Sequence, residues 1–174
     1  YCNISNNNAL DECTNCYGIC LWFSNENTLD NNTLSNGYYG IFLEGSNKNT
    51  LDNNTLSNDF YGICLEDSNK NSLTNNEFIN CGLYVEHSSQ SRVENNIVND
   101  KPLVYLENIS NYAVTEAGQI ILINCSNITV EGLNLSNATI GLELQKINNC
   151  MIANNTLSND YYAIRLSDSN KNVL

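Results

Sequence analysis

Positive charge is scarce in this chain. Its 174 residues include only seven Lys and Arg residues against 19 Asp and Glu residues, which gives a formal net charge of −12. Nucleic acids and anionic membrane surfaces are bound through clustered cations, and the sequence has no such cluster. We therefore expect no nucleic-acid partner.

Long apolar runs are absent as well. No stretch approaches the length of a membrane-spanning helix, so no membrane insertion is expected within this segment. Proline occurs once, whereas Asn fills 36 positions. Asn competes for backbone hydrogen bonds and favours turns, so the composition disfavours helices. Yet 41% of the residues are apolar and they recur regularly, which argues against disorder.

What the sequence does contain is a repeat with a period near 22 residues. Residues 47–58 restate residues 25–36 almost unchanged, and the segment GIFLE at 40–44 returns as GICLE at 62–66. A period of this size indicates stacked supersecondary units rather than an ordinary globular fold.

Aligned copies of the repeat place apolar residues in columns. The column that closes each copy is Leu21, Leu43, Leu65, Val85, Leu106, Ile123, Leu144 and Leu166, and a partner column lies two residues earlier. Two further columns begin at Leu29 and Leu34. Each copy thus holds three short strands of period-two pattern, separated by Asn, Ser and Gly turns, with no room for a helix.

This pattern predicts an all-β fold, a right-handed parallel β-helix of about eight rungs. The hand follows from the general rule for parallel crossovers. We expect one domain over residues 1–174, with an irregular first rung at 1–24 and a shortened rung near 107–123. Neither end resembles the polar cap that a solenoid needs, so we expect a segment of a longer repeat protein or copies that stack end to end.

Pairs of Asn residues recur at one corner of the predicted rungs. Asn tolerates left-handed backbone angles, and stacked amides can form hydrogen-bonded ladders. We therefore interpret the pairs as structural. The first members of the pairs are Asn31, Asn53, Asn75, Asn95 and Asn154.

The repeats resemble those of the NosD-type parallel β-helix proteins and of the carbohydrate-binding and sugar-hydrolase superfamily, which includes many archaeal cell-surface proteins. The segments that carry the resemblance are Asn47–Glu66, Lys101–Leu106 and Gly118–Cys125. The resemblance implies a surface scaffold and is weak for activity, since such folds host many functions. The copper association of NosD-type proteins transfers poorly, because the chain has one His, His87, and one Met, Met151.

Aromatic residues beside the closing strands suggest a carbohydrate-contacting face. If Ile41 and Leu43 point inward, strand alternation places the intervening side chains outward. Aromatic faces beside carboxylates suit an extended sugar chain, although the rings could equally stack on one another between rungs. The candidates are Tyr39, Phe42, Tyr61, Tyr84 and Tyr105.

A column of acidic residues follows the closing strand. Stacked carboxylates repel one another, so either solvent screens them or a cation such as calcium bridges them. The chain lacks the Gly-Gly-x-Gly-x-Asp nonapeptide that marks calcium-binding solenoids, and no other cofactor is expected. The candidate ligands are Glu44, Glu66, Asp67, Glu86 and Glu107.

Four of the eight cysteines crowd the predicted first rung: Cys2, Cys13, Cys16 and Cys20. Thiolates at this spacing can hold zinc or an iron–sulfur cluster, whereas disulfides are typical of exported chains. The cysteines, the acidity and nine Asn-x-Ser/Thr sequons together favour an extracellular or cell-surface glycoprotein.

These observations favour a structural or adhesive module that contacts polysaccharide, other surface proteins or its own copies. We expect no enzymatic activity, because the sequence shows no Asp-Asp pair and no cluster of Arg or Lys beside acids. The alternatives are a polysaccharide-active enzyme domain with its catalytic residues outside this segment, and a self-stacking subunit of a layer or fibre.

Overall fold

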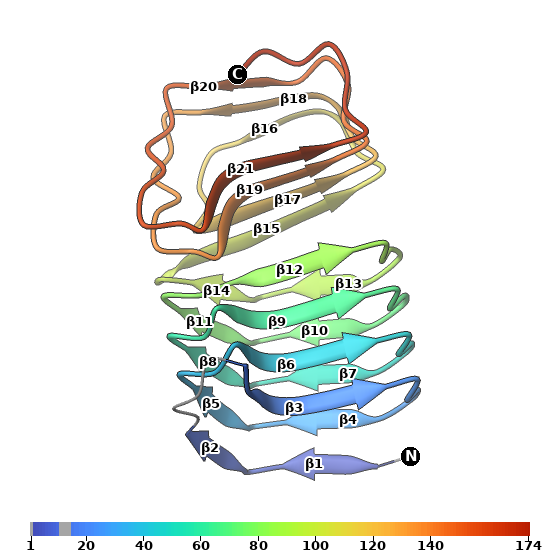
Figure 1. Cartoon of the computed structure of the whole chain (residues 1–174). Coiled ribbons are helices and arrows are strands. Elements are labelled where there is room, and N and C mark those ends of the chain that lie inside the picture. The colour runs from blue at the N-terminus through green and yellow to red at the C-terminus, as the bar shows by residue number, and fades with distance from the viewer. Residues whose placement is uncertain (1, 11–14) are drawn as a thin grey trace.

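The chain folds as a parallel β-helix, as the repeat predicts (Figure 1). The structure, a computed structural model, describes residues 2–10 and 15–174. These residues form 21 strands and no helix. Accordingly, the described ranges contain no helix that is long and apolar enough to cross a membrane.

Residues 2–10 and 15–98 form the N-terminal stack, whose rungs run through three parallel sheets. Sheet A contains β1 (Asn3–Ser5), β4 (Thr28–Asp30), β7 (Thr50–Asp52), β10 (Ser72–Thr74) and β13 (Arg92–Glu94). The first half of sheet B contains β2 (Asn8–Leu10), β5 (Thr33–Ser35), β8 (Thr55–Ser57), β11 (Glu77–Ile79) and β14 (Ile97–Val98). Sheet C contains β3 (Tyr17–Trp22), β6 (Tyr39–Glu44), β9 (Tyr61–Glu66) and β12 (Leu83–Glu86).

Residues 101–174 form the C-terminal stack. Four of its strands complete sheet B, and we call them the shared wall: β15 (Lys101–Glu107), β17 (Gln119–Ile123), β19 (Ile140–Gln145) and β21 (Tyr162–Ser167). Sheet D contains β16 (Ser110–Val114), β18 (Ser126–Glu131) and β20 (Met151–Ala153). The third side of these rungs is reduced to an isolated bridge between Asn134 and Thr156.

The repeat columns become stacks of identical side chains. In sheet A, Leu29 pairs with Leu51 and Leu51 with Leu73, and all three are fully buried. Ile41 and Ile63 are stacked in the same way in sheet C. A core of this kind is close-packed because identical side chains of successive rungs have matching shapes and stack directly on one another.

The Asn pairs divide two structural tasks between their members. The first member, such as Asn53, is the residue with the left-handed backbone, with a φ of 55°. The second member, such as Asn54, is buried and forms the ladder. The Oδ1 atom of Asn54 accepts the backbone N–H of Asn32 at 3.0 Å, and its Nδ2 donates to the Leu29 carbonyl at 3.0 Å.

The predicted ladder therefore needs a correction by one residue. Its buried members are Asn32, Asn54, Asn76 and Asn96, each at most 3% exposed. The first members Asn31, Asn53, Asn75, Asn95 and Asn154 all have φ between 54° and 57°. Some of them also bond to one another on the surface, as Asn53 Nδ2 does to Asn31 Oδ1 at 3.1 Å.

The stacking is interrupted where the two stacks meet. β14 and β15 form an antiparallel pair, with Val98 opposite Lys101. β12 is therefore the edge of sheet C, and β15 does not continue that sheet. The alignment of the repeat copies placed Val104 and Leu106 directly above the strand that contains Val85. This placement is wrong at the junction.

The shared wall belongs to two cores. Figure 1 shows its strands lying between β12 and the strands of sheet D. Ile121 packs into the core of the N-terminal stack, whereas its neighbours Ile120 and Leu122 pack into the core of the C-terminal stack. Every residue of β17 is buried for this reason.

Side chains of the shared wall complete the hydrogen bonding of the β12 edge. Gln119 accepts the Leu83 N–H at 2.9 Å and donates from Nε2 to the Leu83 carbonyl at 2.7 Å. Glu143 Oε2 accepts the Val85 N–H at 3.2 Å, and Gln145 Nε2 donates to the Val85 carbonyl at 2.5 Å. These three side chains take the place of the next strand, so the edge is not left unpaired.

Replacing Asn54 by Ala is expected to lower the free energy of unfolding by about 3 kcal/mol, because a buried N–H and a buried carbonyl lose their partners. The change is measured by chemical denaturation. Asn53→Gly is the matched control, since Gly adopts the left-handed conformation freely, and it should cost less than about 1 kcal/mol. Equal losses in the two variants would contradict the division of tasks within the pair.

Candidate functional site

Aromatic rings form a column on the outer face of sheet C. The centroids of Tyr17 and Tyr39 are 5.0 Å apart, those of Tyr39 and Tyr61 are 5.3 Å apart, and those of Tyr61 and Tyr84 are 4.9 Å apart. The first two pairs lie within 17° of parallel. Each inner ring thus has another ring against both of its faces.

Phe42 and Tyr84 do point away from the rung core, as alternation predicts, but they are not accessible. Together with Cys64 and Ile140 they form a separate buried cluster, against which Tyr39 and Tyr61 pack. Phe42 is 4% exposed and Tyr84 is 7% exposed. The expectation that these two residues offer outward surfaces to a sugar is therefore wrong.

The remaining candidates for sugar contact also lack a free platform. Tyr39 and Tyr61 are half-buried and keep only ring edges towards solvent, because their faces are stacked. Tyr105 lies on the shared wall rather than on sheet C, and its hydroxyl donates to Glu107 at 3.1 Å. The five aromatic candidates therefore do not form one open surface.

The acidic column is shorter than the sequence suggests. Glu44, Glu66 and Glu86 are in register on adjacent strands. Burial is the main cause that raises the pKa of Glu66, and the neighbouring carboxylates add to it. Glu107 lies elsewhere, paired with Ile123 in the shared wall.

The geometry of the acidic residues bears on the calcium hypothesis. Asp67 follows Glu66 in a left-handed conformation, with a φ of 46°. Within the described ranges, no three His, Cys, Asp or Glu side chains are placed to hold a metal ion together. Calcium at the three stacked glutamates and Asp67 thus stays a prediction.

A charged cluster joins the two stacks. Arg165 of β21 contacts Glu86 Oε1 at 2.9 Å through Nη2 and Glu143 Oε1 at 3.1 Å through Nη1. Its guanidinium carbon also lies 5.1 Å from the centre of the Tyr84 ring. The Tyr84 hydroxyl donates to the second oxygen of Glu86. The hydrogen bond from Tyr84, followed by the charge of Arg165, lowers the pKa of Glu86.

Glu143 is the fully buried member of this cluster. Burial raises the pKa of its carboxyl to about 8, although the Val85 N–H, Arg165 and Gln145 all favour the ionised form. Three donors on two oxygens hold this side chain in one position, as its role at the β12 edge requires.

A cavity with a volume of about 320 Å³ opens beside the cluster. Glu86 and His87 line it from the N-terminal stack, and Gln145, Arg165 and Asp168 line it from the C-terminal stack. The oxygens of Glu86 are already engaged by Tyr84 and Arg165. The cavity therefore offers mixed charge, and its Glu86 carboxylate is already held by the chain itself.

Sequence reasoning missed this cluster because its members are far apart. Arg165 and Glu86 are separated by 79 residues. The only signal was that Gln119, Glu143 and Arg165 interrupt apolar strands at outward positions, where the N-terminal copies carry small or aromatic residues.

The cysteines fall into different states. Cys16 is disulfide-bonded, whereas Cys2 and Cys20 are free and exposed. Cys13 lies outside the described residues. With Cys16 oxidised, a metal site that uses all four thiolates of the first rung cannot form. Cys64, Cys81, Cys125 and Cys150 are buried free thiols.

The buried Glu143 carboxyl predicts a pH dependence. Its pKa in the folded state, about 8, lies above the ordinary value of 4.5, so the protonated form favours folding. This contribution is complete below about pH 4.5 and is lost as the pH rises through about 8. Urea denaturation between pH 5 and pH 9 should therefore show a decline in stability that is weaker in Glu143→Gln. If the free energy of unfolding falls with pH at the same rate in both proteins, the raised pKa does not belong to Glu143.

Comparisons with known proteins agree with the observed architecture. Residues 1–81 match the model of a family described as "NosD: Periplasmic copper-binding protein (NosD)". No curated protein gave a significant match.

Among solved structures, the chain was aligned with a trypsin-treated variant of QnrB1, a plasmid-mediated fluoroquinolone resistance protein. The sequences are 14% identical, and the alignment covers 95% of this chain and 92% of that one. The TM-score of 0.22 is too low to support any conclusion. The family match over residues 1–81 and the observed stacks of parallel strands confirm the resemblance stated from the sequence: the chain is a parallel β-helix repeat protein that is similar to the NosD family.

Proposed function

We propose that the chain is a scaffold module of an extracellular or cell-surface protein whose outer faces contact polysaccharide or other surface proteins. The matched family is described as periplasmic, which is an exported location. One observation carries the scaffold assignment: the polar groups at the corners and at the junction of the stacks bond to the chain itself. Asn54 and Glu143, for example, are both buried and fully engaged.

The charged cluster supports a structural rather than a catalytic role. Glycoside hydrolysis needs one carboxyl free to protonate and another free to attack or to activate water. Glu143 is inaccessible, and Glu86 is bound on both oxygens. Neither group can serve as the acid or base while these contacts persist.

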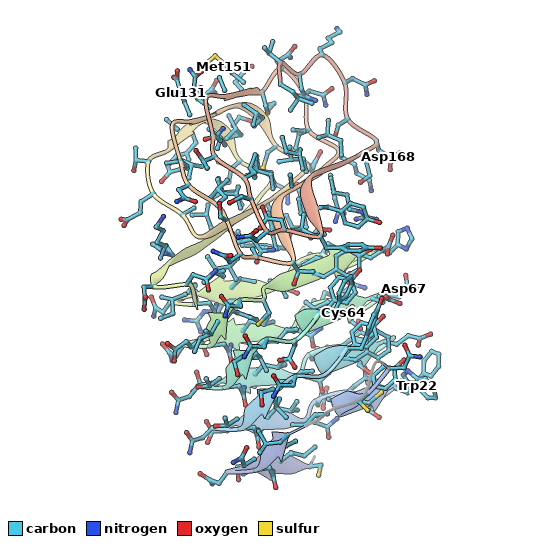
Figure 2. All side chains as sticks on the ribbon, turned by 60° about the vertical axis from the view of Figure 1, so that its left-hand side comes forward. Trp22, Cys64, Asp67, Glu131, Met151 and Asp168 are labelled. Atoms are coloured by element: carbon cyan, nitrogen blue, oxygen red, sulfur yellow. The ribbon has the colours of Figure 1, made fainter. Side chains whose placement is uncertain are left out.

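Copper binding does not follow for this chain from the name of the matched family. Copper sites favour His, Met and Cys ligands. His87 is exposed beside Asp67, with 4.0 Å between Nδ1 and Oδ1, whereas Met151 lies on β20 of the other stack (Figure 2). His87 and Met151 thus do not converge on one copper ion.

An exported scaffold should be accessible on intact cells. Treating living producer cells with an external protease is expected to remove the protein, while a cytosolic marker enzyme in the same sample stays intact. Retention of full-length protein until the cells are lysed would contradict the surface location. Intact-mass measurement of the purified protein would report at the same time whether its sequons carry glycans.

A further inference from the structure

A second cavity, of about 640 Å³, lies away from the junction of the stacks. It follows the corner at which the chain passes from sheet C to sheet A, and we call it the corner groove. Its lining residues come from four successive turns: Asn25, Glu26, Asn47, Lys48, Asn69, Lys70 and Gln90.

The Asn residues of the corner groove use their amide oxygens to accept backbone N–H groups of the next rung. The Oδ1 atom of Asn25 accepts the Asn47 N–H at 2.7 Å, and Asn47 Oδ1 accepts the Asn69 N–H at 2.7 Å. Asn69 Oδ1 accepts the Ser89 N–H at 2.9 Å. Asn47 Nδ2 also donates to the Gly45 carbonyl at 3.3 Å, which uses one of its two N–H groups. With the amide oxygens engaged, Asn25, Asn47 and Asn69 each keep at least one N–H as a donor for a ligand in the groove. These donors recur at the rung spacing of about 4.8 Å.

The charges of the corner groove are nearly balanced. Glu26 and Lys48 form an ion pair with 3.6 Å between their charged atoms. Lys70 is exposed in the next turn and adds a further donor. The groove therefore suits a ligand that is rich in oxygen acceptors and needs no charge of its own.

Two exposed aromatic residues stand at one end of the same corner. Trp22 is 60% exposed and Phe23 is 77% exposed. Both precede Asn25 in the first of the four turns, and the Phe23 ring lies so close to Gly45 that a Cβ there would meet it at 2.6 Å. Figure 2 shows Trp22 projecting from the body of the protein. Unlike Tyr39, Trp22 has no ring stacked on it among the described residues.

We propose that the corner groove, together with Trp22 and Phe23, binds an extended neutral glycan. The donor row would engage hydroxyl and ring oxygens of successive sugars, while the indole of Trp22 would cover an apolar sugar face. The net charge of −12 opposes acidic polysaccharides, since a field of one sign repels ligands of the same sign. This inference rests on the proposed contact with polysaccharide. It places that contact at the corner groove rather than at the column of stacked tyrosine rings on sheet C.

The chain provides its own probe, because Trp22 is its only tryptophan. We would titrate the protein with cellohexaose, chitohexaose, mannohexaose and maltohexaose and record tryptophan emission, with calorimetry in parallel. At least one of these glycans should shift or quench the emission. Its affinity should change less than about twofold between low and physiological salt, because a neutral ligand releases no counterions.

Matched variants locate the site. Trp22→Ala and Lys70→Ala should each weaken the calorimetric affinity at least fivefold. Tyr161→Ala is the control, since it removes an aromatic residue that is also 60% exposed but lies in the C-terminal stack, and it should leave binding unchanged. Circular dichroism would verify that all three variants are folded.

The remaining outcomes separate this inference from the proposed function. Glycan binding that survives Trp22→Ala and is lost in Tyr161→Ala would overturn the corner groove and keep the polysaccharide contact. If the protein binds oligogalacturonate alone, and its affinity falls as the salt concentration rises, the ligand is acidic and the proposal of a neutral glycan is wrong. Absence of heat and of emission change with every glycan, acidic ones included, would overturn both.

Discussion

The whole structure depends on giving each buried backbone N–H an oxygen acceptor at places where no strand lies beside it. Along the strands of a parallel β-helix, neighbouring rungs satisfy one another. At the corners some N–H groups, such as those of Asn32 and Asn54, have no backbone acceptor, and an unsatisfied buried N–H costs about 1–3 kcal/mol. Asn54 and its equivalents supply the missing acceptor one rung after another. At the edge of β12, Gln119 and Glu143 solve the same problem with side chains from another sheet.

Much of the fold could be predicted because the repeat turns local rules into columns. The period fixed the strand positions, and alternation identified Leu29, Leu51 and Leu73 as core residues. The roles within each Asn pair could not be assigned, because the two residues are identical in chemistry. Only their backbone angles distinguish Asn53, with its positive φ, from Asn54, which forms the ladder.

The junction of the stacks could not be predicted from the repeat for a different reason. The apolar columns of the repeat continue across the junction, because a strand that is buried on both faces also carries apolar residues at the positions that would face a rung core. The reversal takes place at Asn99 and Asp100, both with positive φ, and the same residue types are abundant in ordinary turns of this chain. The contacts made by Glu143 and Arg165 then depend on residues about 60 to 80 positions earlier, for which no local rule exists.

The antiparallel junction between β14 and β15 sets a limit on how this protein can grow. Rungs 25–46 and 47–68 are so alike that one is readily understood as a duplicate of the other. A further duplicate placed among them leaves every ladder intact, because each Asn bonds to an equivalent partner. A duplicate placed after β12 would carry that strand away from Gln119, Glu143 and Gln145, which satisfy its edge. An added rung is thus compatible with the interior of the N-terminal stack but not with the position directly after β12.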